Sequence, residues 1–187
     1  MRIFIALDIP KEIRDRLSEY AERMRPSAPE ARWARIEGLH VTLKFIGEVS
    51  DARVQEVKAA LAQVKAKPFE VEFKDVGFFP SHASGRVFWA GVHASEALRQ
   101  LASNIEGALE KLGIPKEKRP YQPHLTLAKA GEGPGAKHRF NVLRQKLDPK
   151  APPQFGTMTA KEFYLYRSEI MRGGARYTKL ERYSVDL

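Results

Sequence analysis

Cysteine is missing from all 187 positions of the chain. This absence excludes a disulfide framework, a zinc site built on cysteine and catalysis by a thiol nucleophile. Long apolar runs are missing too, since no stretch approaches the roughly 20 apolar residues that a membrane-spanning helix needs. The first apolar run, residues 3–7, ends at Asp8 and is too short for a secretory signal. We therefore expect a soluble, cytoplasmic protein that has no membrane partner.

The charges that are present make the chain basic. It has 32 Lys and Arg against 23 Asp and Glu, which gives a net charge of +9 and an isoelectric point near 9.8. This balance favours a polyanionic partner such as nucleic acid. An ordinary solvated basic surface would give the same composition, so charge alone leaves both interpretations open. The basic residues are dispersed along the chain, which favours a folded basic face over a disordered arm.

Helical and strand patterns alternate along the chain and predict a single α+β domain over residues 1–187. Helices are expected from Pro10 to near Pro26, over 52–65, from Ser95 to Gly113 and, in a shorter form, over 136–147. Strands are expected at the second motif described below and over residues 2–8, 31–36, 39–46, 69–73, 86–92, 155–166 and 176–186.

Two of the five histidines stand at the head of nearly the same tetrapeptide, His40-Val-Thr-Leu and His124-Leu-Thr-Leu. Side chains alternate between the two faces of a strand, so the apolar positions up to Phe45 should be buried while each histidine shares the other face with its threonine, Thr42 or Thr126. The two residues of each pair lie roughly 6.6 Å apart along a strand. An imidazole and a hydroxyl can then contact different oxygens of one small anion.

Repetition gives the motif its weight, because one His-x-Thr on an amphipathic strand is ordinarily structural. With an ordinary pKa near 6.5, one imidazole can accept a proton while a second, charged one donates a proton. This pairing suits displacement at phosphorus, with the threonines on the non-bridging oxygens. Without metal or thiol, a strained ribose 2',3'-cyclic phosphate is the natural target, which favours RNA ends over DNA.

Other uses of the histidines find less support. The motif lacks the His-Glu-x-x-His spacing of a helical zinc site, and His82, His93 and His138 have no acidic partner at ligand spacing. The glycine-rich stretch 131–135 resembles a phosphate loop only superficially, because no Gly-Lys-Ser/Thr follows it. We therefore expect no metal, no cofactor and no use of nucleoside triphosphates.

Further segments strengthen the pattern, namely Arg2–Leu7, Arg32-Trp33, Gly77–Pro80 and Pro120–Pro123. Together with the two motifs, and over essentially the whole chain, they resemble the 2H phosphoesterase superfamily. Within it the sequence is similar to the bacterial and archaeal 2'-5' RNA ligase group, also called RNA 2',3'-cyclic phosphodiesterase. The resemblance implies a bilobal α+β fold. Two pseudo-symmetric antiparallel sheets would carry helices on the outside, and the motif strands would face each other across a central cleft.

The resemblance also implies roles. His40 would be the general acid that protonates the departing O3', His124 the general base that activates water, and Thr42 and Thr126 the groups that hold the phosphate. It implies an RNA substrate with a 2',3'-cyclic phosphate end, a 2'-phosphomonoester product and no metal. Joining to an RNA 5'-hydroxyl would be a minor activity, since water is far more concentrated. We expect a monomer.

Lys129 departs from the family pattern, because many relatives carry a phosphate-contacting arginine five residues after the second histidine. Lysine keeps the charge but loses the bidentate fork. Strict alternation from His124 would bury residue 129, so the contact requires the strand to end or bulge near Ala128. Lys44 has the same parity as the first motif and is a second candidate contact. Two aromatic residues, Phe79 and Tyr121, can either stack on a base or belong to the core.

Two other functions remain open at this point. The chain can be an RNA-binding module that kept the fold without turnover, or a phosphodiesterase for small cyclic nucleotides. The intact pair of histidines favours an enzyme.

Overall fold

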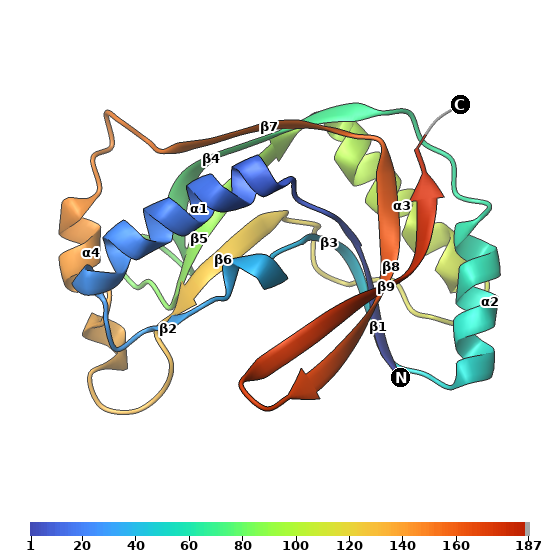
Figure 1. The fold of residues 1–187 in the computed structure, drawn as a ribbon, viewed down its shortest axis with the longest axis horizontal. Coiled ribbons are helices and arrows are strands. Elements are labelled where there is room, and N and C mark those ends of the chain that lie inside the picture. Colours follow the sequence, from blue (N-terminus) through green and yellow to red (C-terminus); the bar gives the residue numbers. More distant parts are fainter. Residues whose placement is uncertain (186–187) are drawn as a thin grey trace.

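The computed structural model describes residues 1–185 as two antiparallel sheets with helices packed around them (Figure 1). Sheet A has the strand order β3 (Val41–Glu48), β1 (Arg2–Leu7), β8 (Glu162–Met171), β9 (Gly174–Ser184). Sheet B has the order β2 (Arg32–Trp33), β6 (His124–Lys129), β5 (Val87–Ala94), β4 (Phe69–Phe79), β7 (Gln154–Ala160). The two motif strands, β3 and β6, thus lie in different sheets, and the predicted bilobal α+β fold is confirmed.

Each of the two longest helices packs on the sheet to which the strand before it does not belong. Helix α1 (Lys11–Met24) follows β1 of sheet A but packs on sheet B, where Tyr20 meets Phe155 at 5.4 Å between ring centroids. Helix α3 (Glu96–Glu110) follows β5 of sheet B but packs on β3 of sheet A. In Figure 1, α1 accompanies β4 and β5 while α3 lies with α2 (Asp51–Leu61) on the side of sheet A. Because each half contributes a helix to the other, the two lobes form one interlocked domain.

One continuous cluster of buried residues joins both sheets and holds the motif strands in place. Its members include the inward residues of both motifs, which are at most 4% exposed: Val41, Leu43, Leu125 and Leu127. Full burial of such an aliphatic side chain contributes about 1.5–3 kcal/mol. The prediction that the apolar motif residues anchor the strands is confirmed for these four positions.

Several predicted boundaries are wrong. The strand expected over 31–36 shrinks to β2 and is followed by a 3₁₀ turn at Ile36–Gly38, because the carbonyls there accept hydrogen bonds from Arg14 instead of a strand. The helix expected over 136–147 is a 3₁₀ turn, Ala136–His138, followed by α4 (Asn141–Lys146). Strand β3 begins at Val41, so His40 stands just before it.

The C-terminal region also differs from its prediction. The stretch 155–166 divides at Lys161, since β7 belongs to sheet B and β8 to sheet A. The stretch expected over 176–186 is β9, which ends at Ser184, and residue 186 lies outside the described residues. The stretch 69–73 extends as β4 to Phe79. No helix among the described residues is long and apolar enough to cross a membrane.

Candidate active site

Strand β3 carries a β-bulge three residues after the first motif histidine. In the pairing with β1, Leu43 is the extra residue between Thr42 and Lys44. An extra residue reverses the alternation of faces beyond it. Lys44 is accordingly buried at 7% exposure, whereas Phe45 is 70% exposed and its ring lies 5.6 Å from that of Phe4. The prediction that Phe45 is buried is therefore wrong.

Lys44 points toward helix α3 instead of sharing a face with the motif. Its Nζ lies 2.6 Å from Oε1 of Glu106 and donates a hydrogen bond of 2.8 Å to the carbonyl of Pro115. The side chains of this ion pair are only 6% and 15% exposed, for the lysine and the glutamate respectively. Lys44 thus braces the helix against the sheet, and its suggested contact with phosphate is wrong.

Strand β6 carries a β-bulge at the corresponding position. In its pairing with β5, Leu127 is the extra residue between Thr126 and Ala128, again three residues after the histidine. Ala128 is fully buried and Lys129 is exposed. The bulge lies where a contact from residue 129 requires it, so the structure places Lys129 on the same face of sheet B as Thr126. The bulge in each strand brings the residue five positions after the histidine, Phe45 or Lys129, to the exposed face. These two residues therefore occupy corresponding positions in the two lobes.

His40 is enclosed by aromatic rings of sheet A. Its ring centroid lies 4.4 Å from that of Tyr166, 5.2 Å from that of Tyr177 and 5.7 Å from that of Phe4. The last two contacts are edge-to-face, which is a favoured aromatic geometry. Tyr177 also covers the backbone before the motif, because a Cβ on Gly38 would lie 2.9 Å from its ring. These aromatic contacts fix the orientation of the imidazole and shield it from water.

This enclosure decides the charge of His40 in the unliganded protein. Burial, together with the nearby guanidinium of Arg14, lowers the pKa of His40 to about 4. The carboxylate of Asp8 and a hydrogen bond to the backbone of Gly38 raise the pKa and only partly offset these effects. The imidazole is therefore neutral at pH 7 before any substrate binds.

His124 has a different environment. Its Nδ1 lies 2.9 Å from the carbonyl oxygen of Gln122, to which it donates when it carries the proton, and Nε2 then remains for other partners. The ring meets Phe79 edge-on at 5.0 Å, and Phe79 lies 5.4 Å from Trp89. Trp89 rests over Gly77, where a Cβ would come within 2.2 Å of the indole. Phe79 and Trp89 thus support the second histidine from β4 and β5.

Two arginines hold the segments that lead into the motifs. Arg14, the fourth residue of α1, donates hydrogen bonds to the carbonyls of Ile36 at 2.7 Å and Glu37 at 3.2 Å. Arg99, the fourth residue of α3, donates to the carbonyl of Tyr121. Sequence reasoning missed both. The signal that could have found them is an arginine at the same place in two helices that each precede a motif.

A hydrogen bond joins the two halves of the site. The hydroxyl of Tyr121, three residues before the second histidine, donates to the carbonyl of Thr42 at 2.9 Å. Tyr121 packs against the core and is not free to stack on a base. The side-chain hydroxyls of Thr42 and Thr126 are half-buried, and neither takes part in a hydrogen bond within residues 1–185. Both hydroxyls therefore remain available to a ligand.

The remaining histidines belong to neither motif. His93 contacts Asp75 at 3.0 Å, and His82 packs its ring near Phe78. Over the described part of the chain, no three His, Cys, Asp or Glu side chains gather closely enough to hold a metal ion. The site consists of imidazoles, hydroxyls and one exposed ammonium group.

Sequence comparison places this arrangement among known proteins. A family model described as LigT like Phosphoesterase matches residues 7–89 and 92–177. The RNA 2',3'-cyclic phosphodiesterase of Thermotoga maritima is 33% identical over 182 residues, which cover 96% of this chain and 93% of the relative. The protein of the same name from Escherichia coli K12 is 30% identical over 187 residues, with 98% and 96% covered.

Solved structures agree with the sequence match. E. coli LigT complexed with 3'-AMP superposes with a TM-score of 0.79 at 28% identity, covering 98% of this chain and 97% of that one. E. coli LigT complexed with phosphate gives a TM-score of 0.75 at 27% identity, covering 100% and 98%. The chain belongs to the LigT-like phosphoesterase family, as its resemblance to the 2H phosphoesterases implied.

Proposed function

We propose that this protein hydrolyses the 2',3'-cyclic phosphate at RNA ends to a 2'-phosphomonoester, with His40 and His124 as the acid and base. One observation carries the proposal: two bulged strands each present a fixed histidine and, two residues later, a threonine with an unengaged hydroxyl. Relatives named RNA 2',3'-cyclic phosphodiesterase support the substrate. A nucleotide and phosphate each bind E. coli LigT, which supports a phosphate ligand for this fold.

In the proposed reaction, His124 accepts a proton from water as the water oxygen attacks phosphorus. The bond from phosphorus to O3' breaks, and His40 gives its proton to that oxygen, which leaves the phosphate on O2'. Thr42 and Thr126 donate hydrogen bonds to the non-bridging oxygens, and the ammonium group of Lys129 balances their charge. The spent acid and base exchange protons with solvent before the next turnover, so no metal or cofactor takes part.

The state of His40 sets a condition on this mechanism. As the proton donor it must be charged, yet burial keeps its pKa at about 4 in the unliganded protein. A phosphate placed beside the ring raises that pKa, because an opposite charge within about 4–6 Å favours the protonated form. His40 therefore takes up its proton together with the anionic substrate, and the free site holds no buried charge.

A nucleotide substrate is favoured over a small inorganic anion by the surroundings of the first motif. Phe45 is 70% exposed next to Phe4, whose ring also touches His40, so an apolar surface adjoins the catalytic ring. A nucleoside can cover such a surface, whereas inorganic phosphate cannot. The same geometry with an RNA 5'-hydroxyl in place of water gives ATP-independent 2'-5' joining as a minor activity.

The deciding experiment is incubation of the protein in EDTA with an oligoribonucleotide that ends in a 2',3'-cyclic phosphate. We expect conversion to the 2'-phosphate end, identified by release of its phosphate by phosphatase, to which the cyclic end is resistant, and by co-migration with a 2'-phosphate standard and not with a 3'-phosphate standard. Binding without any product would instead establish an RNA-binding module. Faster turnover of cyclic mononucleotides than of oligomers at low salt would establish a small-molecule phosphodiesterase.

A further inference from the structure

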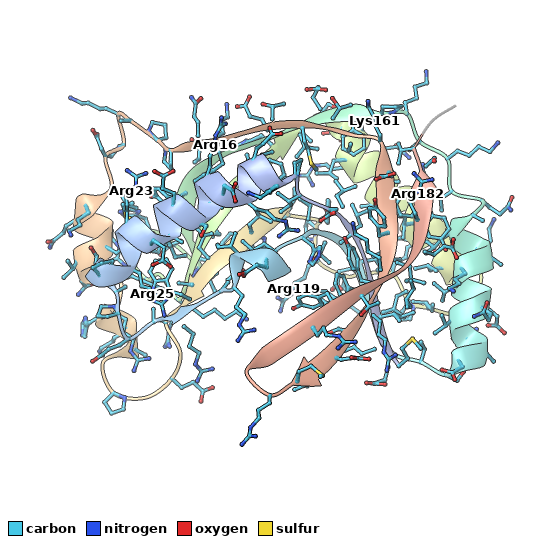
Figure 2. The ribbon with its side chains drawn as sticks, viewed as in Figure 1. Arg16, Arg23, Arg25, Arg119, Lys161 and Arg182 are labelled. Carbon is cyan, nitrogen blue, oxygen red and sulfur yellow. The ribbon has the colours of Figure 1, made fainter. Side chains whose placement is uncertain are left out.

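The basic residues of β8 and β9 differ from those at the end of β6 in whether carboxylates neutralise them. Strands β8 and β9 of sheet A carry four basic residues, and each lies within 4.0 Å of a carboxylate: Arg167, Arg176, Lys179 and Arg182. The basic residues of α1 are also engaged. Arg16 and Arg23 project from that helix and Arg25 from the 3₁₀ turn directly after it (Figure 2), and they contact a carbonyl, a tyrosine ring and a glutamate, respectively.

Four exposed basic residues at the end of β6 have no such partner. They are called the β6-end cluster and comprise Arg32, Arg86, Lys129 and Lys137. None of them forms an ion pair within residues 1–185. The carboxylate of Glu30 approaches this region, but it faces Arg139 at 4.0 Å. The cluster therefore keeps its positive charge.

Three strands bring the cluster together. Arg32 of β2 lies directly opposite Lys129, and Val87 of β5, the neighbour of Arg86, lies opposite Lys129 on the other side. The amide of Ala130 also donates to the carbonyl of Arg86 at 2.8 Å. The charges thus sit at one end of sheet B, and Lys129 stands roughly 16 Å along the strand from His124.

Beside these strands the glycine-rich loop forms a hollow. Residues 133–136, together with Arg86, Glu132 and Lys137, line a cavity of about 350 Å³. Glu132 is the one acidic residue of this lining, against two basic ones. Like charges on neighbouring strands repel each other, and a polyanion relieves that repulsion while it releases counterions.

We propose that Arg32, Arg86 and Lys137 of the β6-end cluster bind the phosphates of the RNA chain that leads into the cyclic end, while Lys129 stands between them and the motifs, at the cyclic phosphate. This inference rests on the proposed function, which places the cyclic phosphate between the motifs. From there the RNA runs along β6 toward the glycine-rich loop, where the charges are unpaired. It does not run across β8 and β9, where carboxylates already occupy the basic residues.

The test compares two double variants with the same loss of charge. Arg86→Gln with Lys137→Gln removes half of the cluster, and Arg176→Gln with Arg182→Gln removes two neutralised charges from β9. Binding of a labelled ten-nucleotide RNA with a 2'-phosphate end is measured by anisotropy across a salt series. The cluster variant should bind about tenfold more weakly and lose about 0.7 of salt slope per phosphate contact, whereas the β9 variant should change less than twofold.

Turnover of a 2',3'-cyclic mononucleotide separates the path from the chemistry. Both double variants should hydrolyse it at the wild-type rate, because neither touches the motifs. Equal weakening of RNA binding by both variants, or by neither, would overturn the proposed path. If the wild-type protein hydrolyses neither the cyclic mononucleotide nor the cyclic-ended RNA, the proposed function fails, and the anisotropy comparison still reports where RNA binds.

Discussion

The two motif strands share a backbone arrangement and differ in what surrounds the histidine. Each strand has a bulge three residues after its histidine. The imidazole of His124 is hydrogen-bonded to the backbone of Gln122, two residues earlier, and the backbone of Gly38, two residues before His40, raises the pKa of that ring. Each preceding segment is held by the fourth residue of a helix, Arg14 or Arg99. The repeated part of the molecule is therefore the support that positions the two rings.

The side chains around these supports differ. Phe4, Tyr166 and Tyr177 enclose the first imidazole, and Phe45 follows it at the bulge. The second lobe has Lys129 at the position of Phe45 and, around it, the other three members of the β6-end cluster. A duplicated scaffold with an apolar half and a charged half is suited to a ligand that is itself part nucleoside and part phosphate.

Removal of either histidine should have the largest effect on activity. We expect His40→Ala and His124→Ala each to lower kcat/KM at least about a hundredfold, since each removes a proton transfer in the transition state. The double variant should be little worse than the single variants, because acid and base act as a unit. Initial rates on the cyclic-ended RNA measure this, with unfolding curves to confirm the fold. A single variant with near-normal rates would remove that histidine from the mechanism.

A changed leaving group then assigns the two roles. A phosphodiester that expels p-nitrophenolate needs no proton from an acid. On this substrate the variant without the acid, His40→Ala, should recover most of the wild-type rate, whereas His124→Ala should stay inactive. Recovery of the second variant alone would exchange the roles of the two lobes.

Lys44 and Phe45 provide a test of the bulge in β3. Lys44→Met leaves the carboxylate of Glu106 buried without its partner, and we expect it to lower the free energy of unfolding by about 3 kcal/mol. Phe45→Ala removes an exposed side chain and should change it by less than about 0.5 kcal/mol. Urea denaturation measures both. If β3 alternated strictly, Phe45→Ala would lower the free energy of unfolding more than Lys44→Met. Addition of Glu106→Leu to Lys44→Met should recover much of the lost free energy of unfolding.

Arg14 and Arg99 form a matched pair for the supports before each histidine. Arg14→Ala leaves the part-buried carbonyls of Ile9 and Ile36 without their donor, at a cost of about 1–3 kcal/mol, and should lower kcat several-fold by loosening the turn before His40. Arg99→Ala loses one such contact and should have the smaller effect. Arg25→Ala, at an exposed position in the 3₁₀ turn just after α1, is the control for charge. Equal effects of all three variants on kcat would argue against a positioning role.

Local patterns predicted each tetrapeptide but not the residues that follow it in β3. The repeated tetrapeptide and its alternation predicted the inward leucines and valine and the shared face of each histidine and threonine. Beyond Leu43 the prediction reversed, because a bulge depends on how β3 pairs with β1, some forty residues away in sequence. The contacts of Arg14 and the exchange of helices between sheets are likewise tertiary. They arise from packing that local periodicity does not record.

The smallest expected effect is a shift in titration that sets the first lobe apart. The folded-state pKa of His40, about 4, lies below its ordinary value near 6.5, so the unfolded chain binds the extra proton between these values. The contribution of the neutral ring to stability is therefore complete above about pH 6.5 and is lost as the pH falls toward 4. NMR titration of the His40 ring should show the low midpoint. Tyr177→Ser, which opens the enclosure, and a bound 2'-nucleotide should each raise it, whereas a midpoint near 6.5 in the free wild-type protein would contradict the enclosure as the cause.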